Sequence, residues 1–128
     1  MIALAQAVLS GRISPSIFHV EEPESYLHAS AHGAVGDLLI EASGHCPVVA
    51  ETHSENLLLR IRRRIAEGDL SPDAVALYFI NDSHEVSRIR IQEDGAVAAW
   101  PSGVFEYDVE ESEAIVAARM DSIAGSAS

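Results

Sequence analysis

Two short apolar segments that run directly into polar residues constrain the fold more than any other feature of the sequence. Residues 17–20 lead into a pair of glutamates, and residues 46–51 lead into a Thr-His pair. Such segments are typical of buried β-strands, and a helix is expected between them over residues 29–42. Strand, helix and strand in this order predict a parallel pair of strands joined by a crossover helix.

Periodicity and turn residues predict the other elements. Helices are expected over residues 1–10, 54–67 and 110–123, and strands over residues 74–80, 86–91 and 96–100. Gly11 and Gly68 are expected to end helices, Ser54 or Thr52 to cap one, and the Glu-Asp-Gly turn at 93–95 to close a hairpin. The sequence therefore predicts an α/β fold with mainly parallel strands, flanking helices and a C-terminal antiparallel hairpin.

Length and composition limit the class of protein. The chain has 128 residues, of which 48% are hydrophobic, so we expect one domain over residues 1–124 and a disordered tail at 125–128. No apolar run approaches the roughly 20 residues that span a bilayer, which predicts a soluble cytoplasmic protein without membrane contact. The single cysteine, Cys46, is expected to pack at the start of a strand.

The charged residues exclude two kinds of site. The net charge is -12 and all eight basic residues are arginines. Because a P-loop needs a lysine and a glycine-rich turn around phosphates, this chain cannot form one from its own residues. Its acidity also argues against direct coating of DNA, so contact with DNA is expected only through a partner.

The acidic residues after the first strand form the main candidate site. Glu21 and Glu22 follow residues 17–20, and His53 follows the second strand. Ligands gather at the carboxyl ends of parallel strands, where one carboxylate can hold a metal-bound water and its neighbour can polarise an attacking water. The alternative from composition alone is a solvated acidic loop.

The ordered motifs resemble those of ABC-type ATPases of the OLD-like and RecF/SMC-like group. The likeness rests on an apolar strand followed by Glu-Glu-Pro-Glu at 21–24, on Leu-His at 27–28 and on Thr-His-Ser at 52–54. These resemble the Walker B motif, the D-loop and the switch histidine of that group. Ala29 stands where the group commonly has proline, and Trp100 to Phe105 resembles the carboxyl-terminal region of OLD-like ATPases.

The resemblance implies a role for each matching residue. Glu21 would be the Walker B acid that holds Mg²⁺, Glu22 the general base for water, and His53 the switch that senses the γ-phosphate of ATP. Ser25, Leu27 and His28 would belong to the D-loop at the interface between two ATPase heads, where they would contact the nucleotide. The implied cofactors are ATP and Mg²⁺, bound only in a completed site.

The resemblance covers the carboxyl-terminal half of such an ATPase. Walker A precedes Walker B in that group, so a Walker A half or a second ATPase subunit is expected as partner, and no hydrolysis is expected from this chain alone. A strand edge left open near residues 48–51 also allows a homodimer. The implied function lies in DNA repair, recombination or phage defence. The alternative is a non-catalytic dimerisation or regulatory module derived from such an ATPase.

Two further interpretations of the charged residues stay open from sequence. Glu24, His28 and His32 are spaced four residues apart, which on one helix face would suit zinc. The arginines at 60 and 62–64 can contact DNA phosphates or form a solvated helix face paired with acids, and the second is favoured in so acidic a chain.

Overall fold

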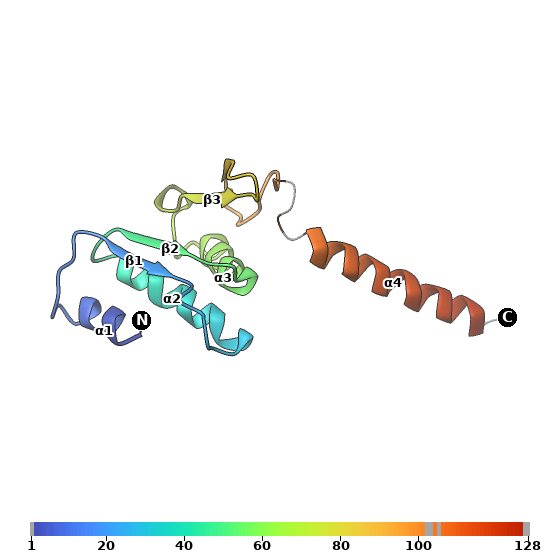
Figure 1. The fold of residues 1–128 in the computed structure, drawn as a ribbon, viewed down its shortest axis with the longest axis horizontal. Helices are drawn as coiled ribbons and strands as arrows, with labels where there is room; N and C mark the ends of the chain where they lie inside the picture. Colours follow the sequence, from blue (N-terminus) through green and yellow to red (C-terminus); the bar gives the residue numbers. More distant parts are fainter. Residues whose placement is uncertain (1, 102–103, 105, 127–128) are drawn as a thin grey trace. The chain divides into compact units, whose positions relative to one another are not determined.

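The computed structural model describes residues 2–101, 104 and 106–126 (Figure 1). These form two units, one spanning Met1–Val75 with Ile91–Ala96 and the other spanning Ala76–Arg90 with Val97–Ser128. The fold is α/β, with helices, one parallel pair of strands and one antiparallel pair. The class predicted from sequence is confirmed at this level.

The first unit contains the predicted strand, helix and strand. β1 (Phe18–Glu21) and β2 (Val48–Glu51) pair in parallel, with Phe18 opposite Val48 and Glu21 opposite Glu51 (Figure 1). The helix between them, α2 (His32–Ser43), is preceded by the 3₁₀ helix η1 (Ala29–Ala31), so it begins three residues later than predicted.

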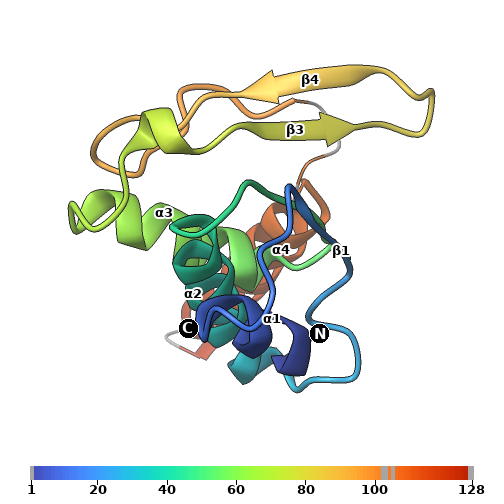
Figure 2. The same cartoon turned by 90° about the vertical axis from the view of Figure 1, so that its left-hand side faces the viewer.

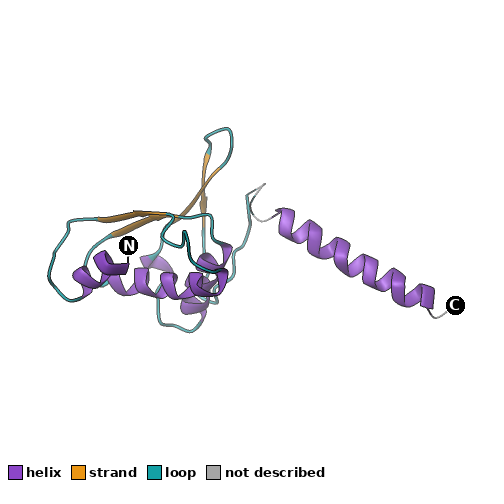
Figure 3. Cartoon of the chain, turned by 60° about the horizontal axis from the view of Figure 1, so that its bottom comes forward, coloured by secondary structure: helices purple, strands orange, loops and turns teal. Residues whose placement is uncertain are grey.

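Helices pack on one side of this strand pair (Figure 3). Phe18 and Val20 of β1 are buried whereas His19 and Glu21 are exposed, so the strand has one core face and one open face. The core joins β1 to α1 (Ile2–Leu9), α2 and α3 (Glu55–Ala66) through buried side chains. These are Ala5, Val8, Phe18, Val20, Val35, Leu39, Ala42, Cys46 and Leu57. Cys46 therefore packs at the start of β2, as predicted.

Local signals placed the helix ends of this unit correctly. Gly11 and Gly68 follow α1 and α3 with φ of 73° and 80°, a conformation that glycine adopts without strain. Ser54 is the N-cap of α3, where its Oγ accepts a hydrogen bond from the Leu57 amide at 3.2 Å. Thr52, the other candidate for this cap, has a different partner described below.

The second unit corrects the predicted strand order. β3 (Leu77–Ile80) pairs with β4 (Val86–Ile89) in an antiparallel hairpin (Figure 2). The segment 74–80 was expected to join the parallel sheet, which is wrong, and its first residue, Ala74, belongs instead to the 3₁₀ helix η2 (Pro72–Ala74). Only residues 81–85 separate β3 from β4, a connection that suits an antiparallel hairpin and is too short for the crossover that parallel pairing needs.

The predicted hairpin of residues 86–91 and 96–100 is also wrong. The turn at 93–95 is present, and the Gln92 amide donates to the Ala96 carbonyl at 2.8 Å. Only single-residue bridges at Ile91 and Val97 flank it, and the described residues 96–100 form no strand. The antiparallel element of the chain is therefore β3–β4, one segment earlier than expected.

The last helix is longer than predicted. α4 (Glu106–Ser126) begins four residues before the expected start and includes Gly125, which was expected in a disordered tail. Residues 127 and 128 of the predicted tail lie outside the described residues. None of the described helices has both the length and the apolar character needed to cross a bilayer.

Candidate functional site

The carboxyl ends of β1 and β2 bring the predicted site residues together. The parallel register aligns Glu21 with Glu51, and the Glu22 amide donates to the Glu51 carbonyl at 2.6 Å, which extends the pairing one residue further. The segments that follow the two strands therefore leave the sheet side by side. This is the edge at which α/β sheets collect ligands.

Glu22 and His53 are in direct contact at this edge. Glu22 Oε1 lies 3.2 Å from His53 Nε2, and the two side chains are 52% and 90% exposed. Ser25 Oγ donates to the other carboxylate oxygen of Glu22 at 3.4 Å. An ion pair this exposed contributes little to stability, so the fold does not depend on it. The structure therefore brings the second glutamate and the histidine of the candidate site into contact.

The backbone at Glu22 is strained. Its φ is 43°, in the left-handed region that residues with a Cβ rarely occupy. Strain of this kind persists where surrounding contacts enforce it and is concentrated at functional positions. The two adjacent glutamates have different partners, since Glu22 contacts His53 whereas Glu21 lies with His19 and Glu51.

Glu21 faces the open side of the strand pair. Its carboxylate lies with the side chains of His19 and Glu51, and one ligand atom from each falls within 4.8 Å of the others. All three side chains are exposed. Glu21 and Glu51 stand opposite each other on neighbouring strands, where like charges repel. Two carboxylates with an imidazole nitrogen form a donor set that a divalent cation can use.

Glu24 is a site residue whose partners the sequence did not reveal. It is 7% exposed, and its Oε1 accepts hydrogen bonds from Thr52 Oγ1 at 2.6 Å and from the His53 amide at 3.3 Å. Its Oε2 is buried without a hydrogen-bond partner among the described residues. Glu24 thus ties the loop after β1 to the loop after β2. The sequence did hold one signal for this role, because the Thr52 hydroxyl and the His53 amide are donors that need an acceptor.

The zinc alternative is not supported by these contacts. Glu24 turns toward Thr52, whereas His32 Nδ1 lies 2.7 Å from Ser54 Oγ and its Nε2 lies 3.3 Å from the Leu27 carbonyl. His28 Nδ1 accepts from the Ser30 amide at 3.2 Å and caps η1. The three residues spaced for zinc are engaged separately.

The predicted D-loop residues lie on an exposed turn. Ser25 contacts Glu22, Leu27 is 37% exposed, and His28 caps η1. Tyr26 between them is fully exposed with φ of 67°. The turn thus presents its side chains outward, and its assignment to a nucleotide contact stays a prediction.

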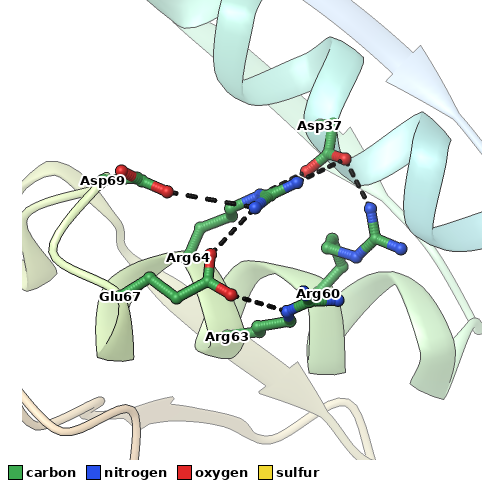
Figure 4. A network of polar contacts seen from close by, with 6 residues as sticks. All are labelled: Asp37, Arg60, Arg63, Arg64, Glu67 and Asp69. Carbon is green, nitrogen blue, oxygen red and sulfur yellow. Dashed lines mark hydrogen bonds and ion pairs between the residues drawn. The ribbon is translucent and has the colours of Figure 1, made fainter.

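The arginines of α3 form a second polar network (Figure 4). Asp37 of α2 accepts from Arg60 and Arg64, and Glu67 accepts from Arg63 and Arg64 at 2.7 and 2.8 Å. The hydrogen bond from Arg64 holds the pKa of the Asp37 carboxyl below its usual value. The hydrogen bond from Arg63 likewise lowers the pKa of Glu67. Three of the four arginines therefore pair with acids, as the favoured interpretation predicts, whereas Arg62 donates to the Gly95 carbonyl.

The site geometry stands without support from known relatives. No protein family, curated protein or solved structure matches the chain.

Proposed function

We propose that the chain supplies the metal-binding and water-activating side chains of a composite ATPase site. The observation that carries this proposal is the contact of Glu22 Oε1 with His53 Nε2, at 3.2 Å, where two parallel strands end. The resemblance of residues 21–28 and 52–54 to the Walker B, D-loop and switch-histidine motifs of ABC-type ATPases gives that contact its chemical interpretation.

Each of the three residues has a role that its position allows. Glu22 is exposed and can accept a proton from a water molecule that approaches from solvent. His53 can donate a hydrogen bond from Nε2 to the γ-phosphate once Glu22 is engaged with water. Glu21, on the open face, would hold Mg²⁺ directly or through a water, because carboxylate oxygens are its preferred ligands. Bound Mg²⁺ would neutralise charge on the phosphates.

The phosphate-gripping half of such a site must come from elsewhere. The 128 residues contain no lysine, and electrostatic stabilisation of the transferred phosphoryl group depends on a lysine and on glycine-rich backbone amides. A Walker A segment or a second ATPase subunit would provide them. Among the described residues β2 pairs with β1 alone, so its other edge is open to a further strand. A role in DNA repair, recombination or phage defence follows from the resemblance.

Manganese provides a direct test of the metal assignment. Mn²⁺ is a paramagnetic substitute for Mg²⁺, and at substoichiometric amounts it broadens the NMR signals of nearby amides. We expect broadening centred on residues 21–22 and 51–53, lost in Glu21→Gln and retained in Glu85→Gln, a matched charge change on the loop between β3 and β4. Broadening that persists unchanged in Glu21→Gln would refute the assignment of Glu21 to the metal.

Hydrolysis by the chain alone provides the second test. We expect no turnover of ATP, since the site lacks its phosphate-binding half. Turnover that is abolished by Glu22→Gln would contradict the composite-site proposal, because the chain would then hold a complete site.

A non-catalytic dimerisation or regulatory module is the second candidate. It is favoured by the exposed apolar side chains of α4, where Ile115, Val116, Met120 and Ile123 are 58–65% exposed. Sedimentation velocity distinguishes the two. A dimer that persists in Glu21→Gln and Glu22→Gln, with no manganese effect at residues 21–22, favours the module.

A further inference from the structure

A hollow on the surface of the first unit lies apart from the residues assigned above. It is open, has a volume of about 290 Å³, and lies between η1 with the start of α2 on one side and α3 on the other. Its polar lining comes from Ser30, Asn56, Arg60 and Arg63. Two guanidinium groups therefore face one small concave surface in a chain with a net charge of -12.

The carboxylates of the neighbouring network are gathered around a third arginine. Arg64 contacts Asp37, Glu67 and Asp69, and it does not line the hollow (Figure 4). Asp37 and Glu67 each take only one nitrogen from the arginines that do line it, Arg60 Nη1 and Arg63 Nε. Within the described part of the chain, these are the only hydrogen bonds that the two guanidinium groups make.

The backbone at Gly33 makes room for one of these guanidinium groups. A Cβ at Gly33 would lie 2.7 Å from Arg60 Nη2 and 2.9 Å from Arg60 Cζ. Any side chain at this position would therefore displace the Arg60 guanidinium. Gly33 lies in the first turn of α2, where alanine would stabilise the helix more than glycine does. The glycine therefore leaves space for the Arg60 guanidinium although it lowers the stability of the helix.

We propose that this hollow binds the phosphoryl group of a small phosphorylated molecule. Arg60 and Arg63 would donate their remaining N–H groups to its oxygens, as guanidinium forks do with planar or tetrahedral oxyanions. The Asn56 side-chain amide, which also donates to the Ala29 carbonyl at 3.4 Å, adds a neutral donor, whereas the Ser30 hydroxyl lies 2.9 Å from His28 Nδ1 and is engaged there. The volume suits one phosphoryl group with a small attached moiety, and the 20 acidic residues of the chain disfavour a long polyanion such as duplex DNA. This site does not depend on the nucleotide proposal.

Inorganic phosphate is the probe for the test. NMR titration is expected to shift the side-chain signals of Arg60, Arg63 and Asn56 together. Arg63→Gln should weaken binding by about tenfold, the effect of one lost charged hydrogen bond. Arg88→Gln, which removes an exposed arginine on β4, is the matched control and should leave the affinity unchanged. Equal losses in both variants would mean attraction by net charge alone and would overturn the proposal.

Gly33→Ala tests the geometry without a change in charge. We expect phosphate affinity to fall while thermal stability is kept or raised, because only the Arg60 guanidinium has to move. Unchanged affinity in this variant would overturn the role of Arg60. A short duplex DNA forms the second arm: binding tighter than that of phosphate, and lost in Arg63→Gln, would replace the small ligand by nucleic acid.

Discussion

The edge beyond β1 and β2 and the arginine network between α2 and α3 are both rich in charge, yet they differ in how that charge is satisfied. In the network Asp37 and Glu67 each have two guanidinium partners. At the strand edge Glu22 meets one exposed histidine, Glu21 faces Glu51, and one oxygen of Glu24 is buried without a hydrogen-bond partner among the described residues. The network therefore stabilises the packing of two helices, whereas the strand edge leaves its groups available to a ligand.

Gly95→Ala, beside Arg62 of α3, is expected to lower the free energy of unfolding most. The Gly95 carbonyl accepts from Arg62 Nε at 2.8 Å, its φ is 79°, and a Cβ would lie 2.5 Å from the Arg62 carbonyl oxygen. We expect a loss of about 2–3 kcal/mol in the free energy of unfolding, measured by urea denaturation.

Gly68→Ala is the matched control for that substitution. Gly68 has φ of 80°, but no atom of the described residues beyond its chain neighbours lies within 4 Å of its Cβ position. Only the backbone conformation is penalised there, so we expect a loss of about 1 kcal/mol. Equal losses at the two glycines would show that the close approach of a Cβ at residue 95 to α3 does not lower stability.

Glu24→Ala is expected to give the next largest effect and tests the one buried acid of the strand edge. It leaves the Thr52 hydroxyl and the His53 amide without their acceptor, which should cost about 2 kcal/mol in thermal or urea unfolding. Glu24→Gln keeps an acceptor for both donors and places an amide where the unpaired oxygen lies, so its stability should stay close to that of the wild type. A large loss in Glu24→Gln would mean that the charge itself is required.

Asp37→Asn should cost about 1–2 kcal/mol, because Arg60 and Arg64 are partly buried and lose their common carboxylate. The substitution also changes the response to acid. The pKa of Asp37 is held below its ordinary value of 3.8 in the folded state, so its contribution is complete above that pH and is lost as the pH falls further. The difference in stability between wild type and Asp37→Asn should therefore shrink below about pH 4. A constant difference across that range would contradict the ion pair.

The same two regions show what the sequence can predict. The strand ends were predicted because apolar runs, glutamates and the Thr-His pair are local signals, and a parallel register then brings Glu22 to His53. The partner of β3 was not predicted, because strand pairing depends on contacts beyond the strand itself. The segment 74–80 has no pattern that distinguishes an antiparallel hairpin from a third parallel strand.

The buried acid shows a second limit. Glu24 lies in a run of acids, and its spacing linked it to histidines only in the zinc alternative. Its burial was not predicted, because it depends on the loop after β2, which is distant in sequence. For the arginine network, the sequence predicted the type of interaction but not the partners. That arginines on α3 would pair with acids follows from composition, but the choice of Asp37 depends on how α2 packs against α3.

Glu22→Gln is expected to change stability least, by less than about 0.5 kcal/mol, since its partner His53 is almost fully exposed. The loss should stay below this value even in low salt, where surface pairs are strongest. The variant therefore contrasts most sharply with Asp37→Asn. Asp37→Asn removes a charge that stabilises the fold, whereas Glu22→Gln removes a charge that we assign to chemistry. The measurement is urea unfolding of both variants side by side. If Glu22→Gln unfolds as readily as Asp37→Asn, the strand edge is a structural cluster, and the strained backbone at Glu22 serves packing rather than a ligand.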